Sequence, residues 1–335
     1  MVASLLVLIS NAHSLPLITS GEYYFLSRPR RFGKSLTLST IKSIYQGEQA
    51  LFAGLWIEDK WDWGQIRPVI HISFSSVDYE GAGLERGIVQ ILHLQAEECG
   101  ISLQSQYVKP MFAELIRKLG KDNQAVILID EYDKPIIDYL DDKEQAKTNQ
   151  AILRTFYSVI KDSDPYIEIL LITEISKFSK DSIFSVLNNL NDITIDPNFA
   201  DLTGYTQEEL EASFEPYMHQ VEKSLSLGRA ELLAKLRHWY NGYTWGGQVY
   251  VYNPFSVLNF FQKGIFRNYW FETATPTFLL QLMREQEVLE LDDVILDELA
   301  FATVDIIRVA STPSCGFGAE SIGNAAARGR AHYTL

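Results

Sequence analysis

The stretch that decides the fold runs from residue 23 to residue 35 and reads YYFLSRPRRFGKS. Its first four residues, Tyr23–Leu26, form an apolar run that predicts a buried β-strand. From Lys34 to Tyr45, apolar side chains recur at helical spacing, which predicts an amphipathic helix. The residues between these two segments are rich in Arg, Pro and Gly, which is typical of a loop. The sequence therefore predicts a strand, a loop and a helix in direct succession.

The loop resembles a phosphate-binding loop, whose consensus GxxxxGK[ST] follows a strand and opens a helix. Gly33, Lys34 and Ser35 match the end of that consensus. Arg28 stands where the first glycine would be. Gly33 would let the backbone approach a phosphate, and N–H groups at a helix N-terminus attract anions. Lys34 could reach the β- and γ-phosphates, and the Ser35 hydroxyl could ligate Mg²⁺. A plain helix N-terminus is the alternative, and the strand–loop–helix context favours phosphate binding.

The residues expected to contact a nucleotide are those of the loop and of the first helical turn. They are Arg28, Pro29, Arg30, Arg31, Phe32, Gly33, Lys34, Ser35 and Leu36. The three arginines concentrate positive charge on this loop, in a chain whose formal net charge is −14. Such a local excess of positive charge suits a polyphosphate ligand.

A second apolar run, Ala125–Ile129, ends in Asp130 and Glu131. An uninterrupted apolar run is typical of a strand covered on both faces. Ligands of open α/β sheets bind at the carboxyl ends of strands. We therefore expect this strand to lie next to the one before the loop, with both carboxylates near the γ-phosphate. Asp130 would hold Mg²⁺ and Glu131 would polarise the attacking water. The alternative is a buried strand that merely exits into a polar turn.

A further apolar run, Ile167–Ile172, ends in Thr173 and Glu174. A polar residue at this strand tip would contact the γ-phosphate or the attacking water. Thr173 is our candidate, Glu174 is the alternative, and a simple cap stays open. The predicted catalytic residues are thus Glu131, Lys34 and Thr173, and the predicted metal ligands are Ser35 and Asp130.

Short apolar runs alternate with longer amphipathic stretches over the first two hundred residues, which predicts an α/β domain with a mostly parallel sheet covered by helices. Its other expected elements are a strand at Val69–Phe74 and helices at Leu84–Glu98, Val108–Leu119 and Gln145–Lys161. We assign residues 1–210 to this domain.

Residues 211–300 predict a smaller, mainly helical domain. Glu211–Tyr240 and Thr277–Leu299 are expected to be helical, and Trp239–Phe261 is aromatic and rich in turn residues. Residues 301–335 are rich in Gly, Ala and Arg, which predicts a disordered or truncated tail.

Bulk properties bear on the class of protein, and they leave a nucleic-acid partner possible but unsupported. The acidic net charge gives no support to a dedicated nucleic-acid-binding domain. Cys99 and Cys315 show no metal-ligand spacing. The apolar run Val2–Ile9 is too short to span a bilayer and lacks the basic start of a secretory signal. We expect it to pack as a helix or strand in a cytoplasmic protein without a membrane partner.

Several ordered segments resemble the bacterial AAA-ATPase-like family, whose members often carry a C-terminal PD-(D/E)XK nuclease-like domain. Besides residues 23–35, they are Asp130–Pro135, Ser176–Ser179, Leu187–Ile193, Trp239–Tyr243, Tyr252–Ser256 and Asn268–Phe271. The resemblance covers residues 20–300, and the family's own loop has Arg in place of the first glycine. It implies a P-loop NTPase core that binds ATP and Mg²⁺, followed by a winged-helix-like region. It also implies the usual roles for Lys34, Ser35, Asp130 and Glu131.

Three functions stay open. The first is an Mg²⁺-dependent ATPase that couples its nucleotide state to a protein partner or to a second copy of the chain, with Arg31 or Arg267 as arginine finger. The second is a nucleotide-dependent binding module that does not hydrolyse. The third is a truncated remnant of a nuclease-linked ATPase. No PD-(D/E)XK signature can be placed, so no nuclease activity is predicted, and steeply salt-dependent DNA binding would distinguish a nucleic-acid partner.

Overall fold

The computed structural model describes residues 15–139, 141–174, 187, 189–245 and 249–270. The chain divides into two compact units. The first runs to Pro29 and resumes at Lys34–Phe199, and the second consists of Arg30–Gly33 and the residues from Ala200 onward. The predicted helix at 277–299, the predicted tail at 301–335 and the apolar run at 2–9 lie outside the described residues.

The first unit is built on a sheet of five parallel strands in the order β2-β3-β4-β1-β5. The strands are β1 (Tyr23–Ser27), β2 (Val69–Ser73), β3 (Ala125–Asp130), β4 (Ile167–Glu174) and β5 (Leu190–Asp192). This sheet confirms the predicted α/β class. The short strand β5 was not predicted.

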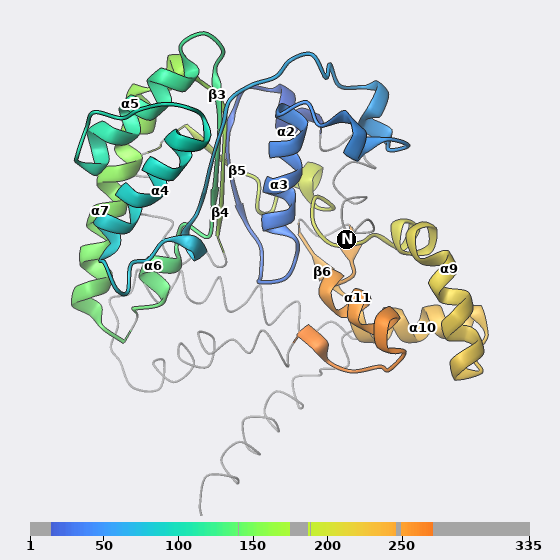
Figure 1. Ribbon diagram of the computed structural model, residues 1–335. Helices are drawn as coiled ribbons and strands as arrows, with labels where there is room; N and C mark the ends of the chain where they lie inside the picture. Colours follow the sequence, from blue (N-terminus) through green and yellow to red (C-terminus); the bar gives the residue numbers. More distant parts are fainter. Residues whose placement is uncertain (1–14, 140, 175–186, 188, 246–248, 271–335) are drawn as a thin grey trace, which may run out of the picture. The chain divides into compact units, whose positions relative to one another are not determined.

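Helices cover both faces of the sheet, as parallel strands require for their crossover connections. Helix α3 (Lys34–Tyr45) and the short α2 (Leu15–Thr19) lie on one face (Figure 1). The opposite face carries α4 (Leu84–Glu98), α5 (Val108–Gly120), α6 (Lys134–Ile137) and α7 (Lys143–Asp162). The described helices include none that is long and apolar enough to cross a bilayer.

The order of the strands corrects one expectation. We predicted that β3, which carries the two acids, lies next to β1, but β4 pairs with both of them and separates them. Apolar runs identify strands without revealing which strands pair. Because all five strands are parallel, their carboxyl ends still share one edge of the sheet, so the two strand tips remain on the same side.

The sheet and the four helices on its second face enclose the main core. All six residues of β3 are buried, among them Ile127 and Ile129. Phe112 of α5 and Phe156 of α7 stack with ring centroids 4.3 Å apart. Burying a side chain of this size contributes about 1.5–3 kcal/mol, so this core stabilises the first unit.

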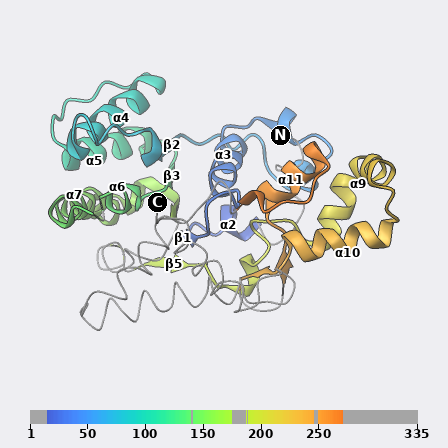
Figure 2. The same ribbon diagram turned by 90° about the horizontal axis from the view of Figure 1, so that it is seen from below.

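The described part of the second unit contains helices α9 (Gln207–Leu225), α10 (Arg229–Tyr240) and α11 (Pro254–Lys263) and the hairpin strands β6 (Tyr243–Thr244) and β7 (Tyr250–Val251). The three helices contact one another (Figure 2). The helical stretch predicted at 211–240 is interrupted at Ser226, whose φ of 52° is left-handed. Helix α11 was not predicted, because aromatic and turn residues obscured its periodicity.

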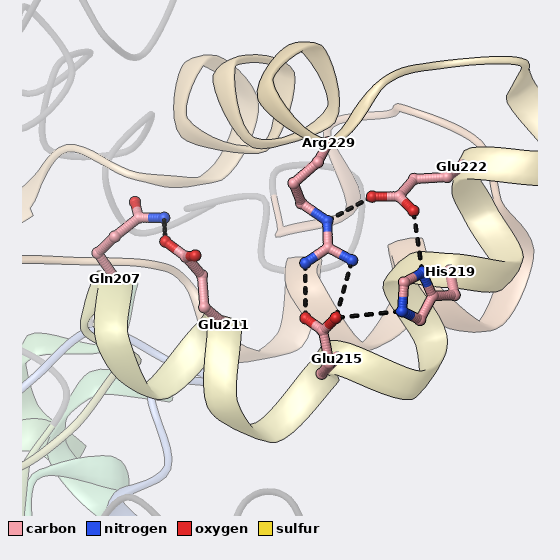
Figure 3. A network of polar contacts seen from close by, with 6 residues as sticks. All are labelled: Gln207, Glu211, Glu215, His219, Glu222 and Arg229. Atoms are coloured by element: carbon pink, nitrogen blue, oxygen red, sulfur yellow. Dashed lines mark hydrogen bonds and ion pairs between the residues drawn. The ribbon is translucent and has the colours of Figure 1, made fainter.

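An arginine on α10 joins that helix to α9 (Figure 3). Its guanidinium donates to both carboxylate oxygens of Glu215, at 2.6 and 3.1 Å, and also to Glu222. His219 contacts both glutamates as well. Arg229 holds the pKa of each glutamate below its usual value. This network joins α9 to α10 within the second unit.

Candidate functional site

The carboxyl edge of the sheet brings together the polar residues that end its strands. Ser27 of β1 stands opposite Glu174 of β4, and Ser73 of β2 stands opposite Asp130 of β3. The N–H of Arg28 donates to the carbonyl of Glu174, which ties the start of the loop to this edge. The edge therefore carries both the acids and the loop that were predicted to act together.

A buried hydrogen bond links the neighbouring strands β3 and β4 at this edge. The hydroxyl of Thr173 donates to Oδ1 of Asp130 over 2.6 Å. Thr173 is fully buried and Asp130 is 4% exposed. A carboxylate removed from water needs such a donor, because an unsatisfied buried charge is costly. Thr173 thus fixes the orientation of the Asp130 carboxylate.

Glu131 follows the strand in a left-handed conformation, with φ of 52°. This conformation is uncommon outside glycine and is concentrated at functional sites. The next N–H, that of Tyr132, donates to the carbonyl of Thr173 over 3.2 Å, which holds the turn. The hydroxyl of Ser75 donates to the Glu131 carboxylate, and the Glu131 side chain is half-buried.

Lys34 opens helix α3 and turns its side chain back toward the start of the loop. Its ammonium donates to the carbonyl of Arg28 over 2.7 Å and to that of Pro29 over 3.2 Å. The preceding residue, Gly33, has a φ of 97°, which glycine adopts without strain. Ser35 follows on the exposed side of the first turn. Helix α3 packs against β3, the strand that ends in Asp130.

Arg28 lies inside the first unit and is 1% exposed. Its guanidinium donates to the carbonyl oxygens of Ser27, Thr194 and Phe199 at 3.0, 2.6 and 3.2 Å. Burial lowers its pKa below the usual arginine value, and the nearby Asp192 carboxylate opposes that shift. The side chain therefore contacts the protein interior, where we had expected it to offer charge to a ligand.

The four loop residues from Arg30 to Gly33 group with the second unit. Phe32 is 1% exposed and packs in that unit's small core with Trp245 and Val251. The indole N–H of Trp270 donates to the carbonyl of Arg30 over 2.9 Å. The packing of Phe32 and this hydrogen bond therefore connect the four loop residues to the second unit.

Two arginines were predicted as sources of an arginine finger. The guanidinium of Arg31 lies 4.3 Å from the ring centroid of Phe255, and the residue has a left-handed φ of 67°. The backbone N–H of Arg267 donates to the hydroxyl of Tyr240. Both residues belong to the second unit. Of the remaining predicted residues, Leu36 is half-buried, and Glu174, the alternative to Thr173, is fully buried.

The residues predicted to hold a metal offer oxygen ligands. The described residues contain no group of three or more His, Cys, Asp or Glu side chains arranged for a metal ion. Mg²⁺ needs no such group, because it is bound through one or two carboxylates, substrate phosphates and water. The buried Asp130 carboxylate and the exposed Ser35 hydroxyl fit that donor set.

Ser75 was missed by the sequence reasoning. It lies in the single helical turn Phe74–Ser76 that follows β2, and so it stands at the same edge as the acids. Two consecutive serines directly after an apolar strand were the signal that could have identified it. That signal was weak, because serine after a strand is also common in ordinary turns.

Comparison with known proteins identifies a family for this chain. The family described as "Predicted AAA-ATPase" matches residues 13–184, which is just over half of the chain and includes β1 to β4 and the loop. No solved structure matches the chain.

A curated relative is the "Uncharacterized protein in vnfD 5'region" of Azotobacter chroococcum mcd 1, which is 44% identical over 276 residues. The aligned part covers 82% of this chain and 51% of the relative, so the chain spans about half the length of that protein. The family match and the five-stranded parallel sheet lead to one conclusion: the chain belongs to the AAA-ATPase-like family.

Proposed function

We propose that the chain binds a nucleoside triphosphate, ATP foremost, through residues 28–36 and hydrolyses it with the help of Mg²⁺. The observation that carries the proposal is Lys34, which opens a helix directly after a strand and donates to two carbonyl oxygens of its own loop. A triphosphate would offer that ammonium stronger, charged acceptors. The N-terminus of α3 adds the positive end of a helix dipole.

We assign metal binding and water activation to the acids at the carboxyl edge. Asp130 and Ser35 would hold Mg²⁺, which when bound neutralises charge on the β- and γ-phosphates. Thr173 keeps the Asp130 carboxylate in one orientation through Oδ1. Glu131 polarises the attacking water and accepts its proton. Its half-buried position and left-handed backbone support a role that needs a fixed carboxylate.

The second unit would transmit the nucleotide state to a partner, either another protein or a second copy of this chain. We assign it a winged-helix-like character, which its three contacting helices and its two-stranded hairpin support. A nucleic-acid partner receives no support from the net charge of −14. ATP as ligand implies a cytoplasmic site of action.

The test is ATP turnover by the purified chain with Mg²⁺, compared with Glu131→Gln. Removing a general base lowers turnover by about 10²–10⁴-fold while leaving the phosphate contacts intact, so the variant should still bind ATP. Glu97→Gln, an exposed glutamate on α4, is the matched control and should keep full turnover. A Glu131→Gln variant as active as the wild type would assign water activation to another group.

A nucleotide-dependent module without hydrolysis is the second candidate. The contact that favours it joins the Ser75 hydroxyl to the Glu131 carboxylate, because a carboxylate held by a hydroxyl is less available to a water molecule. This alternative requires ATP binding by the wild type with no turnover. Ser75→Ala would then raise turnover if the contact is what restrains Glu131.

A further inference from the structure

Arg28 occupies the first glycine position of the phosphate loop, and the backbone there does not need a glycine. The described residues with positive φ near the loop are Arg31 and Gly33, at 67° and 97°, and Arg28 is not among them. Glycine is required only where the chain adopts such angles or where a side chain would clash. The question is therefore what an arginine contributes at this position.

The contacts of Arg28 bridge the end of β1 and the segment that follows β5. The guanidinium reaches the carbonyl oxygens of Thr194 and Phe199, which lie 166 and 171 residues further along the chain. The hydroxyl of Thr194 also accepts the N–H of Ser27 over 3.1 Å. Two consecutive residues at the start of the loop are thus fastened to the same segment.

The backbone of Arg28 forms a hydrogen bond with Lys34. Its carbonyl oxygen accepts the ammonium of Lys34 at 2.7 Å, and its N–H donates to the carbonyl of Glu174 at 3.3 Å. The position of the Arg28 backbone therefore sets where Lys34 rests. A side chain that is buried and held by distant carbonyl oxygens restricts that backbone more than a glycine could.

We propose that Arg28 is a positioning residue for the phosphate loop, which its guanidinium fastens to the segment at Thr194–Phe199 so that Lys34 meets the phosphates. The inference rests on the proposed nucleotide binding and deepens it. It assigns the side chain of Arg28 a role without direct contact to the ligand. It also explains how a loop without its first glycine remains competent.

The decisive variant is Arg28→Gly, because it restores the standard loop consensus while removing the guanidinium. If Arg28 acts as proposed, the variant binds ATP more weakly although its sequence matches the consensus better. We expect the Kd for ATP with Mg²⁺ to rise about tenfold or more, which corresponds to at least 1.4 kcal/mol. Arg86→Ala, which changes an exposed arginine on α4, is the control and should bind as the wild type does.

Chemical rescue separates positioning from a general loss of structure. Guanidinium chloride at millimolar concentration should restore part of the ATP affinity of Arg28→Gly, and sodium chloride at the same ionic strength should not. Lys34→Ala, in which the guanidinium of Arg28 is intact, should gain nothing from guanidinium. All titrations are done at a temperature where circular dichroism shows each variant to be folded.

The outcomes distinguish this inference from the proposed function. If the wild type binds ATP and Lys34→Ala does not, but folded Arg28→Gly binds as tightly as the wild type, the positioning role is wrong and the proposed function stands. If Arg28→Gly does not fold, Arg28→Lys becomes the test variant. Lysine keeps the positive charge but lacks the planar set of N–H donors of the guanidinium. Affinity equal to the wild type in that variant would overturn the role. A wild type that does not bind ATP overturns both proposals.

Discussion

At the scale of single residues, Asp130 and Thr173 form a buried hydrogen bond where two neighbouring strands end. The Asp130 carboxylate is 4% exposed and accepts the Thr173 hydroxyl at 2.6 Å. Burial makes each hydrogen bond to a charge more consequential than it would be in water. The pair therefore links the stability of the sheet edge to the site proposed there.

Replacing Thr173 by Val keeps the shape of the side chain and removes the donor. We expect the free energy of unfolding to fall by about 1–3 kcal/mol, because the buried carboxylate loses its partner. Urea denaturation measures this change, and Thr173→Ser, which keeps a hydroxyl, should retain most of the stability. If the valine variant is as stable as the wild type, the carboxylate is satisfied by other groups.

The sequence could predict where the candidate site residues lie in the elements better than how their side chains are oriented, and their roles stay predictions. Lys34, Asp130 and Glu131 were identified because each stands at a strand or helix end within a known pattern. The inward course of Arg28 could not be foreseen, since its partners are carbonyl oxygens far away in the chain. Every residue has a backbone carbonyl, so residue types do not show which carbonyl oxygens will accept from an arginine.

At the scale of elements, strong periodicity was the dependable guide. The helices at 34–45 and 84–98 begin and end at the predicted residues. Strand β5 was missed because three residues are too few to show a period. Helix α11 carried a signal that we did not use, Asn253 followed by Pro254, and the Asn253 side chain does accept the N–H of Ser256.

Helix α5 carries an acid that organises the segment before it. The Glu114 carboxylate accepts the N–H groups of Gln104 and Ser105 at 3.0 Å and pairs with Lys118 at 2.7 Å. Lys118, followed by these N–H groups, lowers the pKa of Glu114 to about 2. Because the folded pKa lies below the unfolded value of 4.5, the carboxylate stabilises the fold above pH 4.5.

The stabilisation by Glu114 should therefore disappear as the pH falls from 4.5 toward 2. We expect Glu114→Gln to be about 1–3 kcal/mol less stable than the wild type at neutral pH. The difference should shrink in acid, where the Glu114 carboxylate of the wild type gains a proton and becomes neutral, as the glutamine amide already is. Urea unfolding of both chains at neutral pH and in acid measures it, and a gap that is constant with pH would contradict the assignment.

At the scale of the whole molecule, the chain is divided in an unusual way. Four residues of the loop, Arg30–Gly33, belong to the second unit although the flanking residues belong to the first. Phe32 anchors them, with its ring centroid 4.8 Å from that of Tyr243 and 5.6 Å from that of Trp245. The second unit therefore depends on a residue from an early part of the chain for its core.

Phe32→Ala should destabilise the second unit selectively. Removing a buried phenylalanine costs about 3–5 kcal/mol, so amide hydrogen exchange should accelerate in β6, β7 and their neighbours. Phe156→Ala, in the core of the first unit, is the reciprocal control and should accelerate exchange around α5 and α7. Exchange in the hairpin that is unchanged by Phe32→Ala would show that the unit's core does not need this ring.

The most direct test of the central claim is calorimetric titration of ATP with Mg²⁺ into the wild type, Lys34→Ala and Lys42→Ala. Lys42 lies on the same helix, two turns beyond the loop, and controls for the loss of a positive charge. The account predicts binding by the wild type and by Lys42→Ala and its loss in Lys34→Ala. Equal binding by all three chains, or binding by none of them while they remain folded, would contradict the assignment of residues 28–36 as a phosphate-binding loop.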